Sequence, residues 1–125
     1  HKIDSRFREN DIFIATGETT VTCRGNGKGG RNQEFVLSGI RYLLPGQTLL
    51  SIGTDGVDGI CPEKIAGALA DEEILTTAHT RKLSIEKFLQ HNDSYHFFKK
   101  AGGLIKTGAT GTNLGDICLL LTTER

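Results

Sequence analysis

The sequence predicts a single α/β domain with a layered sheet that is at least partly parallel and carries helices on its faces. Short apolar runs that fit strands alternate with segments whose apolar residues recur at helical spacing. The chain has 125 residues, of which 37% are hydrophobic and 24% charged, and this composition fits one soluble domain. Alternating strands and helices are typical of a parallel sheet covered by helices.

The N-terminal part predicts an irregular segment followed by a strand. Residues 1–10 are rich in charge and form a lead-in, so the domain is expected to span residues 11–125. DIFIATGE at 11–18 predicts a strand that ends at Gly17. The β-branched residues of TTVTCR at 19–24 indicate a second strand or a continuation of the first after a bend.

A helix and an internal strand are predicted next. From residue 31 onward, apolar side chains recur at i, i+4, i+7 and i+8, which is one stripe of an amphipathic helix. The members of this stripe are Val36, Ile40, Leu43 and Leu44. Pro45 and Gly46 end the helix, and the short apolar run QTLLSIG at 47–53 predicts an internal strand.

The second half of the chain predicts three more helices and a last strand. Small residues recur at i+4 steps over 64–79, which indicates a helix with a small-residue face. SIEKFLQ at 84–90 is a short helix capped by Ser84, and DSYHFFKKAGG at 93–103 adds helical turns closed by glycines. DICLLLT at 116–122 predicts a buried strand.

Loops of similar composition follow the predicted strands. They are TGETT, RGNGKGGRNQE, GTDGVDG and KTGATGTNLGD, all rich in Gly, Thr, Asp or Asn. Because ligands of α/β sheets lie beyond the carboxyl ends of strands, we expect these loops to converge on one site. Independent turns scattered over the surface are the alternative, since the same residues are common in any turn.

The glycine-rich loop predicts an anion site at the start of a helix. Four glycines between residues 25 and 30 leave backbone N–H groups for a ligand, and the helix N-terminus adds about half a positive charge. Arg31 adds a planar fork that can hold two oxygens. The alternative is that Arg31 pairs with Glu18, Glu34 or an aspartate of the protein.

Two other loops carry polar groups suited to the same ligand. Asp55 and Asp58 can bind Mg²⁺ directly or through water, act as a base, or serve only as turn residues. The last loop offers hydroxyl and amide groups for phosphate or sugar oxygens. They belong to Thr107, Thr110, Thr112 and Asn113. Asp116 opens the last strand and is expected to be a structural cap.

Composition excludes several classes of function. Fifteen basic and fifteen acidic residues give a net charge of zero, which argues against nucleic acid and membrane surfaces as partners. The three cysteines are far apart and favour neither disulfides nor zinc, and the histidines lack metal-binding spacing. No apolar run fits a membrane span, so a cytoplasmic location is expected. The chain has no methionine and is expected to belong to a longer polypeptide.

Two nucleotide-binding motifs are only partly matched. Gly25, Gly27 and Gly30 satisfy G-x-G-x-x-G, but no acidic residue follows at the distance that a dinucleotide-binding unit requires. The spacing G-x-x-x-x-G is followed by Arg31 and Asn32 instead of the Lys and Ser/Thr of a P-loop.

Taken together, the motifs resemble a known domain. GETTVTCRGNGKGGRNQEF, GTDGVDG, AGALAD, NDSYHFF and TGATGTNLGDICLLL are similar to the C-terminal MOFRL domain of the type 2 glycerate kinases, from about Gly17 to Leu121. The resemblance implies phosphoryl transfer from ATP, with Mg²⁺, to the 2-hydroxyl of D-glycerate. It also implies a larger N-terminal α/β domain, in cis or in trans, across a shared cleft. The chain departs from the family pattern at Thr16 and Ala109.

The resemblance also implies functional residues in the matched loops. Arg31 and Asp55 are implied to be catalytic, and Asp55 is the candidate Mg²⁺ ligand. Substrate or phosphate binding is implied for Glu18, Gly27, Gly29, Gly30, Asn32, Gln33, Glu34, Asp58, Thr110, Gly111, Thr112 and Asn113. Without the larger domain, the chain is expected to be inactive. The alternatives are a fragment of an NAD(P)-dependent hydroxypyruvate reductase and a stand-alone, non-catalytic anion-binding module.

Overall fold

The computed structural model describes residues 11–18, 20–21 and 25–123. The predicted lead-in at 1–10 and most of the predicted strand at 19–24 lie outside these residues. The described elements, in chain order, are β1 (Ile12–Gly17), α1 (Arg31–Gly39), a short 3₁₀ helix (Ile40–Tyr42), β2 (Gln47–Gly53), β3 (Gly67–Ala70), α2 (Glu72–Thr80), α3 (Ile85–Gln90), α4 (Ser94–Ala101), β4 (Leu104–Ile105) and β5 (Asp116–Thr122).

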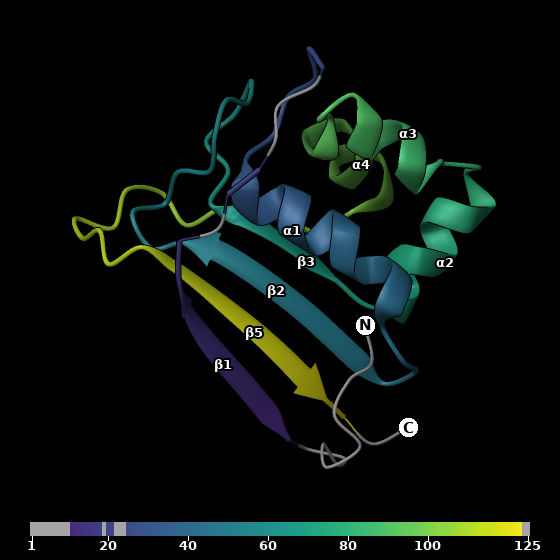
Figure 1. The fold of residues 1–125 in the computed structure, drawn as a ribbon, viewed down its shortest axis with the longest axis horizontal. Helices are drawn as coiled ribbons and strands as arrows, with labels where there is room; N and C mark the ends of the chain where they lie inside the picture. The colour runs from purple at the N-terminus through teal and green to yellow at the C-terminus, as the bar shows by residue number, and fades with distance from the viewer. Residues whose placement is uncertain (1–10, 19, 22–24, 124–125) are drawn as a thin grey trace.

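The five strands of the described residues form one sheet in the order β1-β5-β2-β3-β4, and every neighbouring pair is antiparallel. The prediction of a partly parallel sheet is therefore wrong. Strands β1 and β2 point in the same direction and are joined through α1, as the alternating pattern predicted. However, β5 lies between them and runs antiparallel to both, so the two strands never pair (Figure 1).

The helix predicted over 64–79 is also wrong, because its first part is a strand. Residues 67–70 form β3, and α2 begins only after Asp71, whose side chain accepts a hydrogen bond from Ile74 N at 2.9 Å. The small residues that suggested a helix face allow β3 to lie close to β2. A Cβ atom at Gly67 would lie 1.9 Å from the carbonyl oxygen of Ser51. The pattern of small residues fits both structures, and tertiary packing decides between them.

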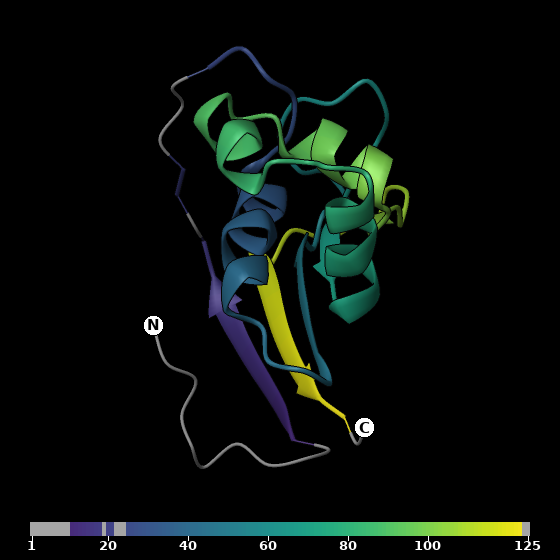
Figure 2. The same cartoon turned by 90° about the vertical axis from the view of Figure 1, so that its right-hand side faces the viewer.

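All four α-helices of the described residues lie on one face of the sheet (Figures 1 and 2). The prediction of helices on both faces is therefore wrong. The buried core between helices and sheet consists of Val36, Leu37, Ile40, Leu49, Ala68, Ala70, Ala78, Phe97, Phe98 and Ala101. The opposite face carries apolar side chains in the open: Ile12 is 59% and Ile14 61% exposed. For the same reason β5, predicted to be buried, is half-buried beyond Asp116.

The remaining predicted elements are confirmed. They are the strand that ends at Gly17, the helix that begins at residue 31, the strands at 47–53 and 116–122, the helix capped by Ser84, and the helix that precedes Gly102 and Gly103. The helix from residue 31 ends at Gly39, earlier than the predicted end at Pro45. The register places Gly17 and Gly53 on either side of Asp116, and α1 begins near the same end of the sheet. The loops after β1 and β2 and the loop before β5 therefore lie together at one edge of the sheet, namely the edge formed by the ends of these strands and not by an outer strand (Figure 1). This edge is the candidate site.

Candidate functional site

The glycine-rich segment at 25–30 packs against the turn between α3 and α4. Gly27 N donates to the carbonyl of His91 at 2.9 Å, and Lys28 N donates to Asp93 Oδ1 at 2.9 Å. A Cβ atom at Gly27 would lie 2.4 Å from the Cβ of Asp93, so only glycine permits this approach. Gly29 N is bonded as well, to the carbonyl of Ile60. These amides are therefore used inside the protein, contrary to the expectation that they were free for an anion.

The N-terminus of α1 is capped by Asp58 from the loop after β2. Its Oδ1 accepts from Asn32 N and Nδ2, and its Oδ2 accepts from Gln33 N and Nε2, all at 2.9–3.0 Å. The N-cap residue itself, Gly30, has no side chain to offer. The Asp58 carboxylate therefore accepts the backbone hydrogen bonds that an N-cap side chain would accept, although it lies 28 positions beyond the N-cap residue. It does so in the interior, since Asp58 is 3% exposed.

Asn32 and Gln33 point into the protein and connect α1 to the sheet. Asn32 Nδ2 also donates to Asp116 Oδ1 at 3.1 Å, and its Oδ1 accepts from Ser51 Oγ at 2.6 Å. Both side chains are buried. The positions predicted to bind substrate thus form, together with Asp58, a polar network that fixes α1 on β2 and β5.

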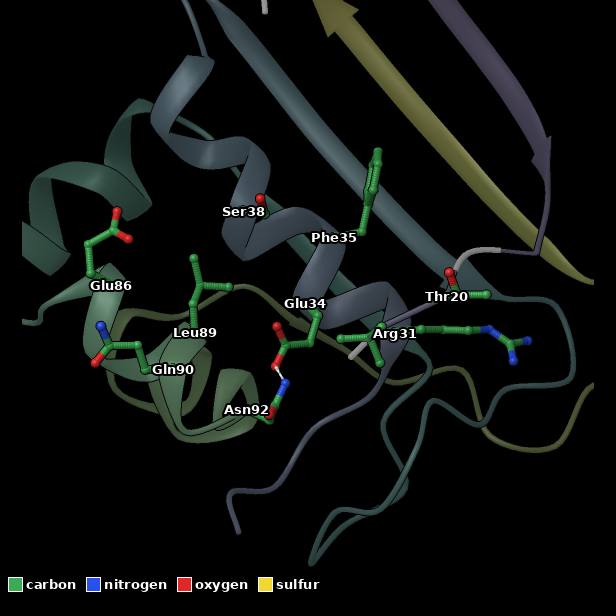
Figure 3. Close-up of a pocket in the computed structure, with 10 residues that line it drawn as sticks. Thr20, Arg31, Glu34, Phe35, Ser38, Glu86, Leu89, Gln90 and Asn92 are labelled. Carbon is green, nitrogen blue, oxygen red and sulfur yellow. Dashed lines mark hydrogen bonds between the residues drawn. The ribbon is translucent and has the colours of Figure 1, made fainter. Parts of the chain in front are cut away.

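Arg31, the first residue of α1, is held by two carboxylates. Its Nε donates to Asp116 Oδ2 at 2.7 Å and its Nη2 to Asp116 Oδ1 at 3.2 Å, while Nη1 lies 3.1 Å from Glu18 Oε1. The hydrogen bond to Asp116 raises the pKa of Arg31 above its ordinary value. Figure 3 shows the Arg31 side chain extending away from Glu34 and Asn92.

A cavity of about 440 Å³, here named the glycine-loop cavity, lies beside Arg31. It is lined by Val21, Gly25, Gly27, Gly29, Gly30, Arg31, Glu34, Asp55, Val57, Asp58, Gly59, Ile60 and Asn92. Arg31 and Asp55, the two predicted catalytic residues, are thus brought to one cavity. Asp55 Oδ1 accepts from Val57 N at 3.0 Å, which shapes the turn around it.

A second cavity of about 510 Å³ lies between α1 and α3 (Figure 3). Arg31 and Glu34 line both cavities. Glu34 is 8% exposed, and burial, together with the charge of Asp58, raises the pKa of its carboxyl, although a hydrogen bond from Asn92 Nδ2 at 3.1 Å lowers it. Glu34 therefore stands at the boundary of the two cavities.

The last loop is tied to the end of β2. Thr110 Oγ1 donates to the carbonyl of Thr54 at 2.5 Å, and Leu114 N donates to Thr54 Oγ1 at 2.7 Å. Four predicted binding residues, Thr110, Gly111, Thr112 and Asn113, are exposed on this loop. They are not among the residues that line the two cavities just described.

Comparison with known proteins identifies the domain. Residues 11–116 match the model of the MOFRL family. The chain belongs to the MOFRL family. It is 41% identical to the D-glycerate 2-kinase of Thermotoga maritima over 118 residues, which cover 93% of this chain and 28% of that enzyme. It is 45% identical to the glycerate kinase of Rattus norvegicus, covering 87% of this chain and 22% of the relative.

Solved structures agree with this assignment. The crystal structure of glycerate kinase from Thermotoga maritima matches with a TM-score of 0.88 and 40% identity, over 96% of this MOFRL chain and 29% of that protein. A protein from Pyrococcus horikoshii matches with a TM-score of 0.89 and 36% identity, over 97% of this chain and 28% of that one. The chain therefore spans less than a third of these relatives, and it corresponds to their C-terminal part.

The MOFRL domain contains a charged cluster that sequence analysis missed. Glu63, in the loop before β3, accepts hydrogen bonds from the hydroxyl of Tyr95 and from Lys99 Nζ at 2.9 Å and Lys106 Nζ at 2.5 Å. These donors lower the pKa of Glu63 to about 2, and the carboxylate raises the pKa of Tyr95 to about 12. The cluster joins the loop before β3 to α4 and to the start of the last loop.

The Glu63 cluster predicts a loss of stability in acid. The pKa of Glu63 is depressed from 4.5 in the folded state, so its stabilising contribution is present above that pH and is lost as the pH falls toward about 2. Denaturant unfolding of wild type and Glu63→Gln across this range should show a smaller acid loss in the variant. Glu73→Gln, on the exposed side of α2, should behave like wild type. Equal acid loss in wild type and Glu63→Gln would contradict the prediction.

The described residues form neither a metal site nor a membrane-spanning helix. Within the described ranges, no group of three or more His, Cys, Asp or Glu side chains is placed to hold a metal ion. None of the helices in these ranges has the length and hydrophobicity that crossing a bilayer requires. Cys61 and Cys118 carry free thiols whose pKa values are raised by burial, while Cys23 lies outside the described residues.

Sequence analysis also underestimated Asp116. It was expected to be a structural cap, but its carboxylate is the main partner of Arg31 and also accepts from Asn32. The available signal was an acidic residue between the TGATGTNLG loop and an apolar strand. That signal does not say which basic residue the acid meets, because the meeting depends on β5 lying beside β2.

Proposed function

We propose that this chain is the C-terminal domain of an ATP-dependent glycerate kinase and supplies part of an interdomain site. The relatives are named glycerate kinases and are more than three times as long as the matched segment. The observation that carries the proposal is that Arg31 and Asp55, from separate loops, line the same cavity at one edge of the sheet. A larger N-terminal α/β domain, in cis or in trans, would close this edge.

Arg31 is proposed to neutralise the charge that develops during phosphoryl transfer. Catalysis of this reaction depends mostly on positioning and charge neutralisation, and a guanidinium fixed at a helix start suits both needs. Glu18 is paired with this cation, whereas Glu34 lines both cavities and is proposed to help select the substrate. Asn32, Gln33 and Asp58 act indirectly, because their hydrogen bonds hold the helix that carries Arg31.

The exposed loop at 106–115 is proposed to contact the phosphates of ATP. Its hydroxyl groups and its exposed glycines, Gly108 and Gly111, lie at the edge where the N-terminal domain would close. Both glycines have positive φ angles of 71° and 74°, so the loop turns in a way that side chains rarely allow. Thr110 and Thr112 then serve as phosphate-binding residues.

Asp55 is the residue of this site that we propose to bind Mg²⁺. Asp55 uses Oδ1 for its own turn and is only partly buried beside the cavity, so it can meet a cation that also binds substrate phosphates. Asp58 does not fit, because both of its oxygens accept from α1. Bound Mg²⁺ would neutralise phosphate charge. Asp55 would orient it, and Arg31 would hold an anionic group of the substrate.

The alternative of a dinucleotide-dependent reductase is not favoured. Its basis was the G-x-G-x-x-G match, but Gly27 and Gly30 lie against the backbone or side chains of Asp93 and Asp58. Within the described residues, the loop amides that would bind a pyrophosphate are mostly bonded to the protein.

We also propose that the kinase is located in the cytoplasm, where thiols stay reduced.

The proposal predicts that the 125 residues alone transfer no phosphoryl group. Residues 1–125 and the full-length product of the gene are assayed for ATP-dependent phosphorylation of D-glycerate. The full-length product should turn over and the isolated chain should not, because half of the site is missing. Turnover by the isolated chain would contradict the interdomain site. If neither the full-length product nor its mixture with a separately encoded N-terminal domain phosphorylates glycerate, the kinase proposal itself fails.

A further inference from the structure

The guanidinium of Arg31 is divided between two carboxylates of very different exposure. The side chain of Asp116 is 4% exposed, whereas that of Glu18 is 71% exposed. Asp116 takes Nε and Nη2, and Glu18 takes Nη1. The Arg31 side chain is 39% exposed, so it has a buried side that faces Asp116 and an open side that faces Glu18. The two carboxylates therefore have different roles.

Asp116 is built to hold Arg31 in place. Two parallel N–H···O bonds fix both the position and the plane of the guanidinium. The carboxylate is itself fixed, because Asp116 is the first residue of a central strand and its Oδ1 accepts from the buried Asn32. An arginine held in this way meets a ligand without losing further conformational freedom.

Glu18 is bound to Arg31 in a way that a ligand can replace. It lies just beyond the end of β1, its side chain is open to water, and only one ion-pair contact joins it to Arg31. Exposed pairs of this kind contribute little to stability. A carboxylate or phosphoryl oxygen of a substrate is also a negatively charged acceptor for Arg31 Nη1 and would displace the Glu18 oxygen at small cost.

We propose that Asp116 is a positioning residue for Arg31, and that the Glu18 carboxylate occupies the place on Arg31 Nη1 that an anionic group of the substrate takes. The inference rests on the proposed kinase function and adds two roles to it. Glu18 competes with the substrate for Arg31 instead of binding the substrate. The anion is a glycerate carboxylate or an ATP phosphate, and the two sources give different experimental results.

The first test is Glu18→Gln in the full-length product. Removing the competing charge should lower KM by about two- to fivefold, the range expected for loss of one exposed ion pair. The fall should appear for D-glycerate if Arg31 meets its carboxylate, and for ATP if Arg31 meets a phosphate. Glu73→Gln is the control, because Glu73 is an exposed glutamate of α2 that lines neither of the two cavities beside Arg31. Unchanged KM for both substrates would overturn the role of Glu18.

The second test is Asp116→Ala and Asp116→Asn, with the Nε–H signal of Arg31 followed by NMR in arginine-labelled protein. Loss of the Asp116 carboxylate in Asp116→Ala should shift this signal and lower kcat/KM by about a hundredfold, as misplacing a catalytic group does. Asp116→Asn should keep the Arg31 signal and kcat/KM closer to wild type, because the amide oxygen still accepts one hydrogen bond from Arg31. If Asp116→Ala does not fold, Asp116→Asn decides. A folded variant with the wild-type Arg31 signal and kcat/KM would overturn the positioning role.

A further readout separates this inference from the proposed function. Titration of the Arg31 signal with inorganic phosphate gives a Kd that needs no turnover. If the full-length product phosphorylates no glycerate but Glu18→Gln binds phosphate more tightly than wild type, the kinase proposal fails and the inference stands. If the full-length product phosphorylates glycerate, but Glu18→Gln has the phosphate affinity and both KM values of wild type, the kinase proposal stands and the inference fails.

Discussion

Arg31→Ala should reduce kcat/KM of the full-length product by about 10²- to 10³-fold, as expected when one preorganised donor to a transition state is removed. The guanidinium lies at the start of α1, beside the glycine-loop cavity, and is already oriented by Asp116. Arg31→Lys should recover only part of the loss, because an ammonium keeps the charge but not the planar fork. Steady-state kinetics with D-glycerate and ATP measure both effects.

The control for Arg31→Ala is Arg41→Ala. Arg41 also pairs with a glutamate, but on the outer surface near α3, away from the glycine-loop cavity. Its removal should change kcat/KM by less than about twofold, as expected for an exposed pair. Thermal melting of each variant shows whether the loss of Arg31 acts through unfolding. Wild-type kcat/KM in folded Arg31→Ala would refute a catalytic role.

Asp58→Ala should lower the free energy of unfolding by about 3–5 kcal/mol, which sums the loss of a helix cap and of partners for buried amides. The four bonds that the Asp58 carboxylate accepts all come from Asn32 and Gln33, residues that are at most 1% exposed. Folding stabilities are typically about 5–15 kcal/mol, so this loss is a large share. Denaturant unfolding measures it.

Asp55→Ala is the matched control for Asp58→Ala, since both residues lie in the same loop. Asp55 is partly exposed and accepts one hydrogen bond, from Val57 N, so its loss should cost about 1 kcal/mol. Asp58→Asn should fall between the two, because one oxygen can still accept from α1. If Asp58→Ala unfolds at the same denaturant concentration as wild type, the capping role is wrong.

Local pattern predicted the elements of this fold better than their arrangement. The start of α1 at Arg31 and the serine cap of α3 depend on neighbours in sequence, and both predictions are confirmed. The predicted helix is shorter than its apolar stripe, because α1 ends at Gly39 and only Val36 of the stripe lies in it. The failures depend on distant contacts. The alternation of strands and helices does not reveal that β5 pairs between β1 and β2, and small residues at 67–70 fit a helix as well as a strand.

The candidate site could be predicted as a place but not as a set of contacts. The loops rich in Gly, Thr and Asp were predicted to converge, and those after β1 and β2 and before β5 do lie together. Arg31 was expected to pair with an anion or with an acid of the protein, and it pairs with Asp116 and Glu18. The sequence could not show that Asp58 caps α1 from the next loop, or that Gly27 is required by the backbone of the turn before α4. Both facts depend on loops that are far apart in the chain.

The position of β5 determines when the sheet can be completed during synthesis of the chain. Because β5 follows the other described strands in the chain and lies between β1 and β2, these two strands remain without their shared neighbour until residue 122 has left the ribosome. A nascent chain that stops before Asp116 exposes two strand edges that invite pairing with other chains. It also lacks the carboxylate that orients Arg31, so translation of β5 completes both the described sheet and the partner of Arg31.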